Sequence, residues 1–67
     1  MAVSYNKLWK LLIDKKMKRI GLMEAAGIGT STLSKLRKDQ YVSMEVLVKI
    51  CKVLNCNIGD IIDMVEE

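Results

Sequence analysis

The side chains in this sequence that are best suited to chemistry are the hydroxyls and cations of residues 30–38. If this stretch is a helix, one face carries hydrogen-bonding groups and positive charge but no bulky apolar side chain. Hydroxyls both donate and accept hydrogen bonds, and ammonium groups attract anions. The pattern therefore favours noncovalent recognition of a polyanion over covalent catalysis. The residues of this face are Thr30, Ser31, Ser34, Lys35 and Lys38.

Catalytic and metal-binding patterns are missing from the sequence. It contains no histidine, and its carboxylates do not cluster in a way that would supply an acid–base pair. Cys51 and Cys56 are five residues apart, and two thiols alone do not complete the four-ligand shell of zinc. Both lie in an apolar pattern, which predicts buried or half-buried free thiols. We therefore expect a protein that is not an enzyme and that uses no metal and no cofactor.

The net charge of +3 is modest, but it is distributed unevenly along the chain. Residues 15–38 contain seven basic residues and one acidic residue, which gives a local charge of +6. Residues 58–67 contain four acidic residues and no basic residue, which gives a local charge of −4. A basic cluster of this kind attracts polyanions, although a solvated charged face would have the same composition.

The length of 67 residues predicts one small domain over residues 1–67, with a small hydrophobic core. No apolar run approaches the roughly 18–20 residues that a membrane-spanning helix needs. The first ten residues lack the apolar core and cleavage site of a signal peptide. Because the two thiols are also expected to stay reduced, these features predict a cytoplasmic protein without a membrane partner.

Five helices are expected to position these side chains, because proline is absent, glycine is rare and apolar residues recur at helical spacing. They are expected to begin after an N-cap at Ser4, at residues 19 and 30, after an N-cap at Ser43, and after Asn57 with Asp60 as its reciprocal capping partner. No segment indicates a strand, so the predicted fold class is all-α, a compact five-helix bundle. Three of these helices carry an apolar stripe, which is a row of apolar residues along one helix face. The stripes of the first, fourth and fifth helices are Tyr5, Leu8, Trp9, Leu12 and Ile13; Leu47, Ile50, Cys51 and Leu54; and Ile58, Ile61, Ile62 and Val65.

The second and third helices, residues 19–26 and 30–38, are predicted to be joined by a tight turn. Gly27 stands where such a turn needs a positive φ, which glycine adopts without strain at Cβ. The result would be a helix-turn-helix at about residues 19–38. Its inward-facing side chains are expected to be Leu22, Ala26, Ile28, Leu33 and Leu36.

Two features near the start of the second helix bear on ligand binding. Lys18 and Arg19 open this helix, where the helix dipole disfavours cations and a bound phosphate would compensate. Trp9 could stack on a ligand, but its place in the apolar stripe favours a core anchor.

Met17 is expected to pack inward at the connection between the first and second helices.

Several motifs of this chain match a known pattern. They are Leu8, Leu22, Gly27, Ile28, the STLSKL run at residues 31–36 and the LVKICKVLNCNIGDII run at residues 47–62. Over residues 5–65 the chain is similar to the Cro/C1-type, or XRE-like, helix-turn-helix regulators. The resemblance implies a lambda-repressor-like domain of five helices. In that family the second helix of the motif enters the major groove of DNA, and the first crosses the backbone.

The resemblance also implies two sets of DNA contacts when it is carried over position by position. Helix capping remains an alternative role for Thr30 and Ser31, and a solvated surface position remains an alternative for Lys35. The implied base-facing residues are Thr30, Ser31, Thr32 and Lys35, and the implied phosphate-facing residues are Lys18, Arg19, Arg37, Lys38, Gln40 and Tyr41.

This sequence departs from the family pattern close to the motif. Because glycine at position 29 replaces a capping serine, Thr30 or Ser31 is expected to cap the third helix. On balance the departures increase the positive charge at the expected groove. Lys18 replaces a small N-capping residue, Arg19 a glutamine, Gly29 a serine, Arg37 a glutamate and Asp39 a glycine.

The function predicted from the sequence is that of a sequence-specific double-stranded DNA-binding transcriptional regulator. One such domain offers a small footprint, so a homodimer is expected to form through the C-terminal helix, where Met64 and Val65 would stay exposed. No small-molecule effector is expected. The alternative is a protein-interaction module that uses the same helices to bind an acidic partner.

Overall fold

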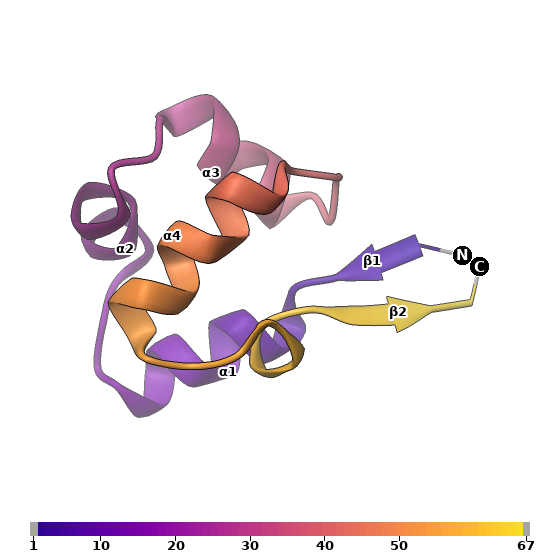
Figure 1. Cartoon of the computed structure of the whole chain (residues 1–67), viewed down its shortest axis with the longest axis horizontal. Helices are drawn as coiled ribbons and strands as arrows, with labels where there is room; N and C mark the ends of the chain where they lie inside the picture. The colour runs from indigo at the N-terminus through magenta and orange to yellow at the C-terminus, as the bar shows by residue number, and fades with distance from the viewer. Residues whose placement is uncertain (1, 67) are drawn as a thin grey trace.

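The computed structural model describes residues 2–66, which form four α-helices, a short 3₁₀ helix and a two-stranded sheet (Figure 1). The strands β1 and β2 pair in antiparallel register, with Ala2 opposite Val65. The two ends of the described chain therefore lie side by side. In chain order the elements are β1 (Ala2–Ser4), α1 (Asn6–Asp14), α2 (Arg19–Ala26), α3 (Thr30–Arg37), α4 (Met44–Leu54), η1 (Ile58–Asp60) and β2 (Asp63–Val65).

Helix α4 crosses the middle of the domain, and the other helices lie around it (Figure 1). Each helix contributes buried apolar residues at three- or four-residue spacing, as the sequence predicts. Ile13 is an exception, because the sequence predicts it in the apolar stripe of α1 but it is 74% exposed. The buried side chains of the helices are Leu8 and Leu12; Leu22 and Ala26; Leu33 and Leu36; and Leu47, Ile50 and Leu54.

The predicted fifth helix is wrong, and so is the all-α five-helix bundle that included it. Only Ile58–Asp60 forms a single 3₁₀ turn, after which the chain extends into β2 (Asp63–Val65) and pairs with β1. The β-branched residues Ile61, Ile62 and Val65 lower the helix propensity of this segment and favour extended backbone. Of the predicted stripe, Ile61 is buried and Ile62 half-buried, whereas Ile58 and Val65 are exposed, so the spacing does not mark a buried helical face. The fold is mostly helical with a small sheet.

The predicted N-caps have mixed outcomes. Ser43 caps α4 as expected, because its Oγ accepts a hydrogen bond from the Val46 N–H at 3.3 Å. The Asn57 N–H donates to Asp60 Oδ2 at 3.0 Å, so the reciprocal cap is present, although it begins η1 and not an α-helix. The N-cap predicted at Ser4 lies one residue too early, because Ser4 belongs to β1 and Tyr5 occupies the N-cap position of α1. The Ser4 Oγ nevertheless accepts a hydrogen bond at 3.3 Å from the N–H of Asn6, the first residue of α1.

The turn after α2 confirms the role predicted for Gly27. Its φ of 68° lies in the left-handed region, and the Ile28 N–H closes the helix by donating to the Met23 carbonyl at 3.1 Å. Ile28 is buried just beyond the turn. Met17, at the connection between α1 and α2, is half-buried against the core, as predicted.

Tyr5 joins the start of α1 to the segment that follows α3. Its backbone N–H donates to Asp39 Oδ1 at 3.0 Å, and its Oη donates to the Gln40 carbonyl at 2.8 Å. Its side chain is only 1% exposed. Asp39 has a left-handed φ of 56°, a conformation that glycine or a short polar residue tolerates best. Aspartate therefore replaces glycine here and adds a hydrogen-bond acceptor for Tyr5.

Replacing Tyr5 with phenylalanine tests this link. The variant keeps the buried ring but leaves the Gln40 carbonyl without its phenolic donor, so we expect a loss of about 1–2 kcal/mol in the free energy of unfolding. For a domain of this size each 1 kcal/mol lowers the melting temperature by about 4–8 °C. Thermal unfolding followed by circular dichroism measures the loss, and an unchanged melting temperature would contradict the proposed role of Tyr5.

The same hydroxyl should make stability depend on pH in the alkaline range. Burial, and then the charge of Asp39, raise the pKa of Tyr5 above its ordinary value of 10.0. The unfolded chain therefore releases the phenolic proton first as pH rises, and the stabilisation is lost as pH increases above 10. Urea unfolding at about pH 9 and about pH 11 should show a smaller pH-dependent loss for Tyr5→Phe than for the wild type. Equal pH-dependent losses in the two proteins would contradict the role of the Tyr5 hydroxyl.

The turn is tested by Gly27→Ala. The added Cβ meets open space, so the expected loss of about 1–2 kcal/mol comes from the left-handed backbone alone. Gly59→Ala is the matched control, because its Cβ also meets open space and its φ is not positive. That variant should be neutral or more stable by up to about 1 kcal/mol. Chemical denaturation of both variants measures the difference, and equal stabilities would exclude backbone strain as the cause.

Candidate nucleic-acid interface

Helix α3 is held by one face and exposes the other. Leu33 and Leu36 are buried, and both lie on the side that faces the core. Thr30, Ser31 and Lys35 are exposed. Thr32, the fourth residue of the implied base-facing set, is half-buried at the edge of this face. The burial of two leucines therefore determines which hydroxyls and which cation α3 presents to a ligand.

The first turn of α3 keeps its hydrogen-bonding capacity. The first intrahelical bond runs from the Leu33 N–H to the Gly29 carbonyl at 3.1 Å, so the amides that precede Leu33 have no partner in the helix. Gly29 is the N-cap residue, and among residues 2–66 no side-chain oxygen caps α3. The expected capping by Thr30 or Ser31 is therefore wrong, because α3 already begins at Thr30. Their hydroxyls and the free amides remain available to an anion.

Two cations stand at the N-terminus of α2. Lys18 is the N-cap residue without a side-chain hydrogen bond, and Arg19 is the first residue of the helix. The first turn of α2 contains no acidic residue. The helix dipole and both side chains therefore place positive potential at the same point, and a phosphate would relieve the repulsion.

Arg19 rests on an aromatic support that the sequence analysis missed. Its guanidinium carbon lies 4.3 Å from the centroid of the Trp9 ring, a distance typical of a cation–π contact. Trp9 is half-buried and packs against the core, so the predicted anchor role is confirmed. The stack on Arg19 is an additional role. It joins α1 to α2, and helical periodicity within either segment carries no signal for such a contact.

The remaining implied phosphate contacts follow the exposed face of α3. Arg37, Lys38, Gln40 and Tyr41 are all exposed, and Lys38 is the C-cap residue of α3. The Tyr5 hydrogen bonds to Asp39 and to the Gln40 carbonyl fix the backbone of this segment. The implied contact residues thus lie in three places: the start of α2, the exposed face of α3 and the segment after α3. Figure 1 shows α2 and α3 joined by a short turn in its upper left part.

Other kinds of site have little support in the part of the chain that the structure describes. Within residues 2–66, no group of three or more histidine, cysteine or acidic side chains could hold a metal ion. Cys51 and Cys56 are half-buried free thiols, as predicted. No helix within these residues is long and apolar enough to cross a membrane.

Comparisons with known proteins agree with this geometry. The family profile of the Cro/C1-type HTH DNA-binding domain matches residues 7–67. The crystal structure of the transcriptional regulator VanUg (Form II) is similar to the whole fold, with a TM-score of 0.96 and 56% sequence identity. That alignment covers 98% of this chain and 88% of the VanUg chain. No curated protein matches the sequence significantly. The chain belongs to the Cro/C1-type helix-turn-helix family of DNA-binding domains, which are not enzymes.

Proposed function

We propose that this chain is a sequence-specific transcriptional regulator that reads double-stranded DNA through the exposed face of α3. One observation carries the proposal: the buried Leu33 and Leu36 orient α3 so that its hydroxyls, Lys35 and uncapped first turn face outward. The similarity to VanUg, a transcriptional regulator, supports the regulatory role. A helix of this kind fits the major groove, where each base pair presents a distinct pattern of donors and acceptors.

Base recognition is assigned to the residues near the start and middle of α3. The Lys35 ammonium can donate to O6 and N7 of guanine, a contact that contributes roughly 1–3 kcal/mol of discrimination. Thr30 and Ser31 can donate or accept, so they tolerate several bases. Thr32, at the edge of the face, suits a thymine methyl or a phosphate.

Phosphate contacts are assigned to both ends of the motif. Lys18 and Arg19 bring two cations and the free amides of α2 to one backbone position. The second group follows α3 and consists of Arg37, Lys38, Gln40 and Tyr41. These contacts set affinity and orientation but do not read sequence. Each cation that neutralises a phosphate adds ~0.9 to the slope of log affinity against log salt concentration.

A homodimer completes the proposal. Two copies related by a two-fold axis would read two half-sites, which gives the specificity that one small domain lacks. The predicted C-terminal pairing helix is replaced by β2, on which Met64 is 60% exposed and Val65 is also exposed. We assign self-association to this strand. A cytoplasmic location agrees with DNA binding and with the two reduced thiols.

Lys35→Ala tests the base-reading role. Because Lys35 is exposed, the variant should keep the wild-type melting temperature and lose about 10- to 100-fold in affinity for the preferred site. Arg37→Ala should instead weaken binding to all sequences and lower the salt slope by ~0.9. Lys10→Ala is the control, because Lys10 lies where α1 faces η1. Fluorescence anisotropy on labelled duplexes measures the affinities.

The outcome that contradicts this assignment is specific. If a folded variant with both Lys35→Ala and Arg37→Ala binds DNA as tightly as Lys10→Ala does, α3 is not the reading helix. The protein-interaction alternative would then apply to this face.

Selection of binding sites from random duplex DNA at two salt concentrations tests the complete proposal. We expect enrichment of an inverted repeat whose half-sites lie about one helical turn apart. A single enriched half-site would contradict the dimer but keep sequence-specific recognition. Salt-sensitive binding without enrichment would leave a nonspecific polyanion binder, and absence of binding at either salt concentration would favour the protein-interaction module. Equilibrium sedimentation with and without the selected DNA checks the oligomeric state.

A further inference from the structure

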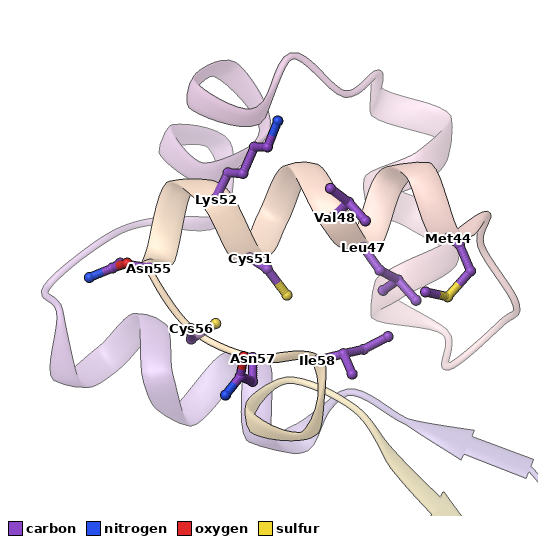
Figure 2. Close-up of a pocket in the computed structure, with 9 residues that line it drawn as sticks. All are labelled: Met44, Leu47, Val48, Cys51, Lys52, Asn55, Cys56, Asn57 and Ile58. Carbon is purple, nitrogen blue, oxygen red and sulfur yellow. The ribbon is translucent and has the colours of Figure 1, made fainter.

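The C-terminus of α4 brings the two cysteines of the chain together. Asn55 ends the helix with a left-handed φ of 51°, and the Cys56 N–H donates to the Cys51 carbonyl at 3.1 Å. This closing bond places the side chain before the turn against the side chain after it, a position that apolar pairs usually occupy. Here the pair is Cys51 and Cys56. Figure 2 shows Cys51 on the side of α4 that faces the following segment, on which Cys56 lies.

The backbone geometry is compatible with a covalent link. With standard bond lengths, the 3.1 Å contact limits the separation of the two Cα atoms to at most about 7 Å. Disulfides usually join Cα atoms about 4.4–6.8 Å apart. The separation that this contact allows therefore overlaps the range that disulfides span.

A small reagent can reach the pair. Cys51 and Cys56 are both half-buried and line one open groove of about 410 Å³ between α4 and η1. Met44, Val48 and Ile58 line the same groove, so the thiols lie at an apolar surface. Burial and the neighbouring Cys51 raise the pKa of Cys56; Asp60 adds to this effect, and Lys15 opposes it.

We propose that Cys51 and Cys56 form a reversible modification site that low-molecular-weight disulfides oxidise to an intramolecular disulfide. One protein thiolate attacks a sulfur of the small disulfide, whose S–S bond breaks and releases one thiolate. The second protein thiolate then attacks the protein sulfur of this mixed disulfide and releases the other thiolate. The protein loses two electrons and two protons, and the small disulfide becomes two thiols.

The link would join the end of α4 to the segment that leads into η1 and β2. Because the folded chain already holds the two cysteines near one another, the disulfide restricts the unfolded chain more than the folded one. The loop that it closes is short, so we expect a modest rise in the melting temperature of about 5–10 °C. The site lies apart from α3, so this proposal does not depend on DNA recognition.

Oxidised glutathione is the probe for the test, applied to the folded wild-type protein. Mass spectrometry under non-reducing conditions should show the loss of two hydrogens without a retained glutathione, and dithiothreitol should reverse it. Cys51→Ser and Cys56→Ser, each with one thiol, should instead retain one glutathione. Thermal unfolding before and after oxidation should show the rise in melting temperature for the wild type alone. The reaction should accelerate as pH rises toward the raised pKa of Cys56.

Three outcomes would overturn the proposal. They are a wild-type protein that retains two glutathiones, one that links to a second copy, and one that stays unmodified while the unfolded chain forms the disulfide. Each of them would mean that the folded backbone does not hold the two sulfurs within bonding reach. Because these readouts use the wild-type protein, they do not depend on the folding of the serine variants.

Discussion

The two hydrogen bonds of Tyr5 help to determine how the domain presents α3, the helix that we propose reads DNA. Helix α3 is short and anchored by two leucines, and its ends are fixed by different means. The Gly27 turn positions its start, whereas Tyr5 fixes Asp39 and the Gln40 carbonyl just beyond its end. Since Tyr5 is almost completely buried and lies between β1 and α1 in the chain, the N-terminal segment helps to hold α3 in place. A displacement of Tyr5 would therefore also displace the segment that follows α3.

The start of α2 shows how a locally unfavourable arrangement can serve a ligand. Lys18 and Arg19 stand at the positive end of a helix whose first turn has neither an acidic residue nor a side-chain cap. The Trp9 ring stabilises Arg19 without neutralising it, because its quadrupole attracts the cation while the positive charge remains. The unpaired amides and the retained charge give an anion more to bind than either would alone.

Much of the helical structure could be predicted because its signals are local. Periodicity placed the buried leucines of α1 and α4, side-chain chemistry placed the Ser43 cap, and Gly27 marked the turn. The sheet could not be predicted this way, because β1 and β2 have three residues each and pair across nearly the whole chain. Strands this short show no clear alternation of apolar and polar residues, and the spacing of the apolar residues near β2 resembles that of an apolar helix face.

Contacts between distant residues limited the prediction of the site as well. Tyr5 reaches Asp39 across 34 positions, and Trp9 supports Arg19 from a different helix. Neither contact produces a periodic pattern of residue types in the sequence. The residues of α3 could be ordered around the helix from the sequence, because the positions of Leu33 and Leu36 determine the opposite face.

The antiparallel pairing of β1 with β2 also has a consequence for the order of folding. During synthesis β1 is made before the four helices, but its partner exists only after α4 and η1 have been made. Helices form in microseconds or less because their hydrogen bonds join residues close in the sequence, whereas pairing between distant segments must first close a long loop. The helix-turn-helix can therefore collapse on α4 before the sheet exists, and strand pairing becomes the final step that fixes Tyr5 in its buried position.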